Sequence, residues 1–435
     1  MKRLNTLKYA CVLFVLFVPF VSLAQTWQTL NANAFGWRFE DMQFVNTETG
    51  WVVDGGGQIL KTSNGGLSWT QQYYNSDYYF RSVEFYNENI GFAGTLANGN
   101  PTATLLKTID GGTTWTDISS NLPVSVAGIC GMHMVDESTI YITGLFYADA
   151  YIMKSVDQGN TWTYTDMGTL CNALVDIYFK DENMGYAAGQ SAQGTGLKGI
   201  IVRTIDAGQT WNTVVLGEDS NERIWKIQEL NDSVMYGSVE AHTDTPEYYK
   251  SVDGGLTWQL NSVTSVGVSG TIQGIGFLSE DIGWVGGYDT FFYETTNQGN
   301  NWDYKPTVGT SFNRFQRIND TLMYTSGTNV YKYVDPSLLS IEEFEINKPK
   351  GHTMQVQGSN IIKDNAILEL DLINNTYCEL SIYNTIGQRI KTISQGRRNA
   401  GHYEIPFSVK TISKGQYFVV LYTYHGYESI KIIID

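Results

Sequence analysis

The feature that most constrains the fold is a short motif that recurs six times along the chain. The first copy runs from Thr62 to Trp69 (TSNGGLSW), and the second runs from Thr108 to Trp115 (TIDGGTTW). Successive motif tryptophans are separated by 46, 47, 49, 47 and 44 residues. Such a period indicates a repeat architecture, in which each supersecondary unit completes its core against its neighbours. The motif positions are Asn64, Asp110, Asp157, Asp206, Asp253 and Asn297, followed by Trp69, Trp115, Trp162, Trp211, Trp258 and Trp302.

The pattern Ser/Thr-x-Asp-x-Gly-x-x-Trp resembles the Asp-box (BNR) repeat, and its chemistry suits a hairpin turn. The Asp or Asn side chain accepts hydrogen bonds from nearby backbone amides, and the Gly adopts a left-handed conformation. The Trp ring is then available for burial between sheets. We therefore interpret the repeated carboxylates as structural groups rather than as calcium ligands or catalytic acids.

A second phrase lies between the boxes. Phe44 precedes Gly50-Trp51 by six residues, and Phe85 precedes Gly91-Phe92 by the same distance. Each unit of about 46 residues then holds four short strands, which is typical of a propeller blade. The abundance of aromatics (11 Trp, 28 Tyr and 19 Phe) and of Gly (44) fits short strands joined by tight turns.

The two ends of the repeat array predict how the ring closes. Trp27 lies in a segment that reads as the exit strand of a blade without its box, whereas Phe315–Ile318, Leu322–Ser326 and Val330–Val334 supply three strands with no box after them. If the first strand completes the last blade, no sheet edge is left exposed. The sequence thus predicts an all-β, seven-bladed β-propeller over residues 25–335. Rings of six or eight blades are the alternatives.

The box and the Phe-Gly-aromatic phrase, from Thr26 to Asp335, together resemble the Ycf48/HCF136-like propellers. That resemblance implies the propeller fold and a scaffold or binding role. It does not carry over a role in photosynthesis, since no residue here points to one.

The N-terminus has the features of a secretory signal peptide. Lys2, Arg3 and Lys8 precede an apolar run from Tyr9 to Val21, and Ser22-Leu23-Ala24 is a small-x-small cleavage signature. We expect residues 1–24 to be removed, which leaves a mature chain that starts at Gln25 and has no transmembrane segment. A membrane anchor is the alternative, although the apolar run is short for a span.

The region after Pro336 changes character. Residues 336–350 read as a linker, and residues 351–435 show alternating strand patterns such as Gln416–Tyr422, which predict a small C-terminal β-sandwich. Several spaced phrases are similar to the type A sorting domain of the type IX secretion system: Leu380–Arg389, Ala400–Tyr403, Lys414–Phe418 and Ser429–Ile434. The resemblance implies export through the periplasm and across the outer membrane, with the machinery as a partner and a secreted or cell-surface location. The sorting-signal positions are Gly387, Gly415, Tyr417 and Lys431. An ordinary adhesive sandwich is the alternative.

Charge and thiol content limit the remaining functions. The formal net charge of -16 argues against a nucleic-acid partner, which requires a basic surface. Cys11 leaves with the signal peptide, while Cys130 and Cys171 could form a disulfide in an oxidising compartment. Three buried free thiols, with Cys378 the third, are the alternative. The five His residues lack metal-ligand spacing, so neither a metal nor another cofactor is expected.

The inner strands of a propeller line a central funnel, so the residue four positions before each Phe of the second phrase is a binding candidate. An aromatic run of Tyr73, Tyr74, Tyr78, Tyr79 and Phe80 offers either a contact patch or loop packing. We therefore expect a binding protein for an unknown protein or glycan ligand. The funnel positions are Glu40, Arg81, Cys130, Val175, Lys226, Gln273 and Arg314, and the charged or polar ones are the candidates.

Glycoside hydrolysis, sialidase-like or of another Asp-box type, is the alternative function. The propeller has few arginines for a substrate carboxylate and lacks the Arg-Ile-Pro signature, and Gly-x-Ser-x-Gly does not occur. No catalytic residue is therefore assigned. Two facing carboxylates roughly 5–10 Å apart in the funnel would favour hydrolysis.

Overall fold

The protein is described by a computed structural model that covers residues 27–96, 104–144, 150–193, 196–218, 221–241, 245–263, 271–334, 353–373, 376–384, 389–423 and 426–435. The chain divides into two compact units, Gln25–Leu338 and one that contains Leu339–Asp435. The expected signal peptide, the expected linker and Gly387 lie outside the described residues.

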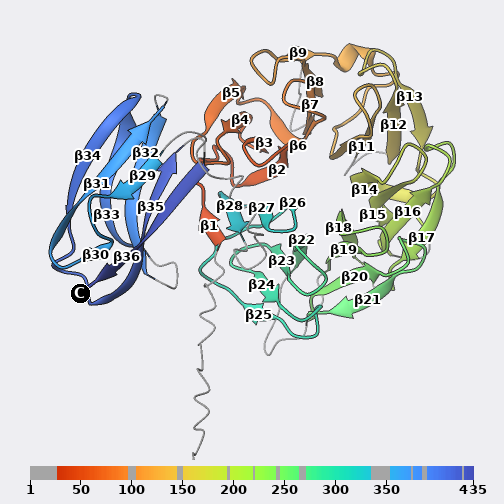
Figure 1. The fold of residues 1–435 in the computed structure, drawn as a ribbon. Helices are drawn as coiled ribbons and strands as arrows, with labels where there is room; N and C mark the ends of the chain where they lie inside the picture. Colours follow the sequence, from red (N-terminus) through yellow and green to blue (C-terminus); the bar gives the residue numbers. More distant parts are fainter. Residues whose placement is uncertain are drawn as a thin grey trace, which may run out of the picture. The chain divides into compact units, whose positions relative to one another are not determined.

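The described part of the first unit forms seven four-stranded antiparallel sheets, arranged as blades around a ring (Figure 1). Each blade begins at the centre of the ring and proceeds outward. Blades 1 to 3 comprise β2 (Phe39–Phe44), β3 (Thr49–Asp54), β4 (Gln58–Ser63), β5 (Thr70–Tyr74), β6 (Tyr79–Phe85), β7 (Gly91–Leu96), β8 (Leu105–Thr108), β9 (Thr116–Asp117), β10 (Gly131–Met134), β11 (Ile140–Gly144), β12 (Tyr151–Ser155) and β13 (Thr163–Asp166), with a short 3-10 helix at Ser119–Asn121.

The remaining blades repeat this order, and the seventh takes its outermost strand from the beginning of the chain. Blades 4 to 6 comprise β14 (Cys171–Phe179), β15 (Gly185–Ser191), β16 (Gly199–Thr204), β17 (Asn212–Leu216), β18 (Arg223–Glu229), β19 (Met235–Glu240), β20 (Glu247–Ser251), β21 (Gln259–Ser262), β22 (Ile272–Phe277), β23 (Gly283–Gly287), β24 (Phe292–Thr295) and β25 (Asp303–Tyr304). Blade 7 comprises β26 (Phe315–Asn319), β27 (Leu322–Ser326), β28 (Val330–Val334) and β1 (Trp27–Thr29).

The predicted closure of the ring is confirmed. Strand β1 pairs antiparallel with β28, with Trp27 opposite Tyr333, and the two strands lie side by side in Figure 1. The Trp27 ring also meets the ring of Trp284 from blade 6 edge to face, at a centroid distance of 5.1 Å. The N-terminal strand therefore completes blade 7 and packs against blade 6, as expected for a seven-bladed ring.

The second sequence phrase holds neighbouring blades together. Trp51 of β3 stacks on Phe85 of the next blade's inner strand, with ring centroids 3.5 Å apart. The ammonium group of Lys61, which belongs to the same blade as Trp51, lies 4.8 Å from the centroid of the Trp51 ring. The Trp51 indole N–H and the Lys61 ammonium also donate hydrogen bonds to the carbonyl of Gly111 in the box of the next blade. The same stack joins Tyr141 to Phe179, Tyr236 to Phe277 and Tyr324 to Phe44.

The boxes form the hairpin turns expected from their residue types. In the third box, Ser155 Oγ donates to Asp157 and accepts from the amide of Gly159, while the Thr161 amide and hydroxyl both donate to the Asp157 carboxylate. These hydrogen bonds, those of the Thr161 side chain first, lower the pKa of Asp157 to about 2. The carboxylate is thus fully engaged within its own turn.

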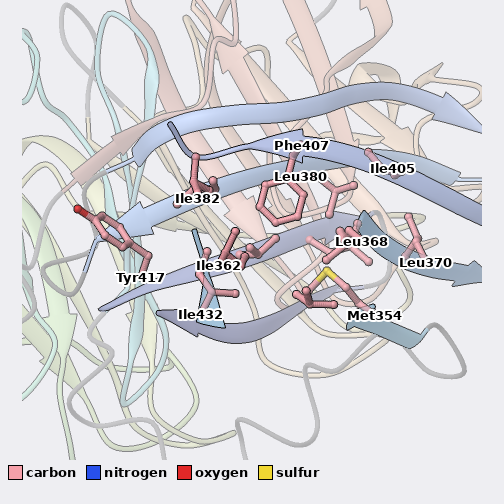
Figure 2. Packing of buried hydrophobic residues seen from close by; sticks show 14 of the residues in the cluster. Met354, Ile362, Leu368, Leu370, Leu380, Ile382, Ile405, Phe407, Tyr417 and Ile432 are labelled. Atoms are coloured by element: carbon pink, nitrogen blue, oxygen red, sulfur yellow. The ribbon is translucent and has the colours of Figure 1, made fainter. Parts of the chain in front are cut away.

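The second unit is the predicted β-sandwich. One sheet has the order β29 (Thr353–Val356), β31 (Asn365–Leu372) and β34 (Gly401–Ser408). The other has the order β30 (Ile361–Ile362), β36 (Gly426–Ile434), β35 (Gly415–Thr423), β32 (Thr376–Asn384) and β33 (Arg389–Arg398). Alternate side chains from both sheets fill the core between them, as Figure 2 shows. Among the sorting-signal positions, Tyr417 lies in this core, Lys431 is exposed, and Gly415 begins β35 with a φ of 156°.

Candidate binding site

The inner strands share a local irregularity that turns side chains into the central channel. Their registers shift around Glu40, Arg81 and Gln273, because each of these residues bulges out of its ladder. A bulge kinks the strand and re-aims its side chains. The predicted funnel positions therefore lie near the start of the inner strands, at the end of the channel that we call the mouth.

The first layer below the mouth is a compensated ion-pair cluster. The guanidinium groups of Arg38 and Arg81 each contact the Glu40 carboxylate, both at 3.1 Å. Arg38 also donates to the Gln273 side chain from across the ring. Burial by itself would raise the pKa of Glu40, but the charges of Arg81 and Arg38 outweigh it and hold that pKa below its ordinary value. Glu40 is thus ionised, and two guanidinium groups share its one carboxylate.

A second layer joins facing blades. Arg314 of blade 7 contacts Asp41 of blade 1 and Asp176 of blade 4, both at 2.8 Å. Lys226 of blade 5 lies 3.8 Å from Asp176. Burial of Lys226, together with the nearby charge of Arg314, lowers its pKa to about 8. The predicted candidates Lys226 and Arg314 therefore do come close together, and Asp176 is their common partner.

Apolar side chains lie beside these ion pairs, with Arg81 5.0 Å from the centroid of the Trp225 ring. Trp225 packs with Cys130 and Val175, and its indole N–H donates to Asn313 of blade 7. Glu40, Arg81, Lys226 and Gln273 are all buried. The hypothesis that the funnel residues form an open polar mouth therefore needs correction. Glu40 pairs with Arg81, whereas Lys226 and the half-buried Arg314 contact Asp176, and Gln273 accepts from Arg38.

The thiols of the propeller lie in separate clusters. Cys130 packs beside Trp225, whereas Cys171 lies in the core between blades 3 and 4, and both are free and buried. The disulfide allowed by the sequence is therefore not formed, and Cys378 of the sandwich is also a buried free thiol. Burial raises the pKa of Cys130 to about 11 and that of Cys171 to about 12, so both thiols are protonated at neutral pH.

The opposite end of the channel carries Glu84 and His133. Burial raises the pKa of Glu84 to about 8 and lowers that of His133 to about 4, so both groups are predominantly neutral at pH 7. Glu84 accepts a hydrogen bond from the Met134 amide, and the His133 ring lies 3.6 Å from its carboxyl group. A neutral pair of this kind relieves the cost of burying charge.

Large aromatic side chains are exposed at the mouth, in the segment that leads from β1 to β2. Phe35 is 58% exposed and Trp37 is 65% exposed, although both are large and apolar. Trp37 stacks on Tyr288 of blade 6 with an interplanar angle of 17°, and Phe35 meets Tyr74 of blade 1 edge to face. Tyr74 is itself 51% exposed. We call Phe35, Trp37, Tyr74 and Tyr288 the aromatic rim.

A buried carboxylate fixes the rim in place. Asp54, which is fully buried, accepts hydrogen bonds from the amides of Phe35 and Gly36 through Oδ2 and from those of Gly56 and Gln58 through Oδ1. The segment that contains Gly36 and the turn that contains Gly56 touch so closely that a Cβ on Gly36 would lie 2.6 Å from the Gly56 nitrogen. Two hydrogen bonds to Asp54 therefore hold the rim segment at Phe35 and Gly36 before any ligand arrives, and the other two fix the loop of Asp54 itself.

The aromatic run predicted as a contact patch mostly packs inward. Tyr78 and Phe80 are buried, Tyr73 and Tyr79 are half-buried, and only Tyr74 reaches solvent extensively. Sequence reasoning missed Phe35 and Trp37, whose signal is two aromatics flanking a glycine in a segment with no strand alternation. The rim thus keeps Tyr74 from the predicted patch and takes its other members from elsewhere.

Among the described residues, no cluster of His, Cys, Asp or Glu is suited to hold a metal ion. The same residues contain no helix long and apolar enough to cross a membrane.

Comparison with known proteins matches a part of each unit to a different family. The model of the photosystem II assembly factor YCF48 family matches residues 21–130, and the secretion system C-terminal sorting domain matches residues 362–435. A search of curated proteins finds no match.

Solved structures extend the likeness of the propeller. A YCF48 structure with a bound D1 peptide is 17% identical, with a TM-score of 0.53, over 71% of this chain and 96% of that one. YCF48 from Cyanidioschyzon merolae is 15% identical, with a TM-score of 0.55, over 72% and 99% of the two chains. A family 74 xyloglucanase from Xanthomonas campestris is 10% identical, with a TM-score of 0.54, over 87% and 63%. Likeness at these identities shows a common fold. Together with the two family matches, it supports a Ycf48-like β-propeller in the first unit and a C-terminal sorting domain of the type IX secretion system in the second.

Proposed function

We propose that this protein is an exported binding protein, whose propeller holds a partner at the aromatic rim. The observation that carries the proposal is the exposure of Phe35 and Trp37 beside a channel whose charged residues Glu40 and Arg81 are buried and in contact with each other. Large exposed aromatics fixed in one conformation lose little entropy when a partner covers them. The filled channel serves as the rigid support of the rim.

Export follows from the sorting domain, which points to passage out of the cell. Under the proposal, residues 1–24 direct the chain to the periplasm and residues 351–435 direct it across the outer membrane. Deletion of 351–435 in a bacterium that has the type IX system should leave the propeller in the periplasmic fraction. Delivery of the truncated chain to the surface or medium at the full-length level would contradict this route.

The channel geometry supports binding over hydrolysis. Asp41 and Asp176 face each other from blades 1 and 4, but both are buried and both contact Arg314. Burial by itself would raise the pKa of Asp176, but the charges of Arg314 and Lys226 hold it below its ordinary value, so this carboxylate stays ionised. Glycoside hydrolysis instead needs one protonated acid near the scissile bond.

The binding proposal is tested on the mature full-length chain. Wild type and a Phe35→Ala/Trp37→Ala double variant are applied to a glycan array and a peptide array, with a panel of 4-nitrophenyl glycosides assayed in parallel. Tyr86→Ala is the matched control, because Tyr86 is also exposed but follows β6 at the opposite end of the channel. We expect saturable binding that only the double variant loses. Equal binding by the double variant, or glycoside hydrolysis abolished by Asp176→Asn, would overturn the proposal.

The YCF48 structure with a bound D1 peptide indicates that a propeller of this fold can hold a polypeptide segment. A peptide is therefore included among the partners tested, alongside glycans.

A further inference from the structure

We infer that the aromatic rim binds a neutral polysaccharide, with pyranose rings stacked on Trp37 and Phe35. The inference rests on the proposed function, because it names the class of ligand for the same rim. Four properties of the rim support it, namely its flat exposed faces, the engaged cation beneath them, its occupied backbone donors and its preorganisation. Polar side chains at its border add to these.

The first property is the geometry of the exposed rings. Tyr288 stacks on the Trp37 indole in an offset arrangement, with ring centroids 5.7 Å apart, and Trp37 remains 65% exposed. The indole therefore presents a flat platform that is backed by a second ring. A pyranose ring has one apolar face of C–H groups, which contacts such a platform through dispersion and weak C–H interactions with the π system.

The second property is that the cation nearest to the platform is already engaged. Arg38 lies 5.5 Å from the Tyr288 centroid, but its guanidinium donates both Nε and Nη2 to Glu40 and is buried. A charged ligand would have to break this pair to gain an ionic contact at Arg38. The net charge of -16 also repels a polyanion. An uncharged polymer meets neither cost.

The third property separates a polysaccharide from a peptide. A peptide that adds to a protein surface in extended form gains much of its affinity from main-chain hydrogen bonds. At the rim, the amides of Phe35 and Gly36 already donate to Asp54. A sugar chain instead uses its hydroxyl groups and needs no free strand edge.

Hydrogen-bonding side chains border the platform. The Tyr288 hydroxyl accepts from the Gln273 side chain, and Thr290 and Tyr304 share a hydrogen bond at the same end of blade 6. Thr290 and Tyr304 are exposed, so their hydroxyl groups can exchange hydrogen bonds with a ligand. Apolar faces flanked by a few fixed polar groups are the usual composition of a small-ligand site.

The fourth property is preorganisation. Phe35 and Trp37 flank Gly36, whose backbone is fixed by Asp54 and by close contact with Gly56. Phe35 leans toward blade 1 and Trp37 toward blade 6, since their ring partners are Tyr74 and Tyr288. The rim thus offers two separate aromatic surfaces, which suits a polymer with more than one sugar residue in contact.

Affinity electrophoresis of the mature full-length chain tests the inference. The gels contain laminarin, galactomannan, xyloglucan or dextrin as neutral probes, or alginate as an anionic probe of similar size. We expect at least one neutral polymer, and not alginate, to retard the wild-type chain. Trp37→Ala should weaken that binding about ten-fold or more and Phe35→Ala several-fold, whereas Trp37→Phe should retain part of it and the control Tyr86→Ala all of it.

The outcomes separate this inference from the proposed function. Binding to none of the neutral polymers, or binding that Trp37→Ala leaves unchanged, would overturn the polysaccharide inference. If a peptide array shows binding that the Trp37→Ala variant loses, the inference is wrong but the rim remains a binding site. If no probe of either kind depends on Trp37, both proposals fall. Circular dichroism and unfolding curves of each variant establish that the loss is not due to misfolding.

Discussion

Removal of the Trp27 side chain should loosen the closure of the ring by a predictable amount. The ring of Trp27 packs against four others, Trp284, Phe292, Phe315 and Tyr333, at centroid distances of 5.1, 5.6, 6.0 and 5.4 Å. A buried Trp→Ala change costs about 3–5 kcal/mol, and Trp27 is only partly buried. We therefore expect Trp27→Ala to destabilise blade 7 by about 3 kcal/mol.

Hydrogen exchange at the β1–β28 pair is the most direct assay of that cost. The amide of Leu30 donates to the carbonyl of Val330, so its exchange reports separation of the two strands. A loss of about 3 kcal/mol predicts roughly a hundred-fold faster exchange at this amide, since 1.4 kcal/mol corresponds to a factor of ten. The mature chain is used throughout.

Two further variants make the result interpretable. Trp27→Phe should cost less than about 1 kcal/mol, because it keeps edge-to-face contacts and removes a buried indole N–H that has no hydrogen-bond partner within the described part of the chain. Gln28→Ala is the control, because Gln28 lies in the same strand and is exposed. Equal exchange in Trp27→Ala and Gln28→Ala would refute the role of Trp27 in closure.

Three further predictions follow from the site. Glu84 has a pKa raised above its unfolded value of 4.5, so its stabilising effect is complete below about pH 4.5 and is lost as the pH rises through about 8. Urea unfolding should show that wild type loses stability relative to Glu84→Gln between about pH 4.5 and pH 8, by up to about 1.4 kcal/mol per pH unit. A difference between the two proteins that does not change with pH would refute this prediction. Arg314→Met leaves Asp41 and Asp176 without their shared cation and should cost about 3–5 kcal/mol in the same measurement; a cost below 1 kcal/mol would contradict the buried pairing. Asp54→Ala removes the acceptor of four amides and should cost about 3 kcal/mol, with faster proteolysis within residues 31–38; unchanged proteolysis would show that the rim does not depend on Asp54.

The repeat made most of the fold predictable. A fixed period places each box at the same turn, and the Phe of the inner strand sets the register from which the channel positions were counted. The closure was also predictable, because three strands at one end and one strand at the other complete a single blade. Because the box recurs in six units, its repeated positions identify the same turn each time.

The pairing inside the channel was not predictable in the same way. Arg314 and Asp176 lie 138 residues apart and meet only because blades 4 and 7 face each other across the ring. The sequence therefore predicted that Glu40, Arg81 and Lys226 face inward but not that they are buried and paired. Burial removed their role as an open binding mouth.

The rim was missed for a different reason. Phe35 and Trp37 lie in an irregular segment that occurs once, so no repeat marks them. The run from Tyr73 to Phe80 contains more aromatics but precedes and enters an inner strand, where a ring is needed for packing. The number of aromatics in a run is thus a poor guide to exposure when the strand boundaries are unknown.

We propose that a partner binds at the rim, outside a channel whose residues Glu40, Arg81 and Lys226 are buried. Hydrogen exchange of the mature chain, measured with and without the ligand found on the arrays, tests this claim most directly. The account predicts slower exchange at residues 31–40 and 285–292, with no change at residues 84–90. Slower exchange confined to residues 84–90 and the box turns at the opposite end of the channel would contradict it.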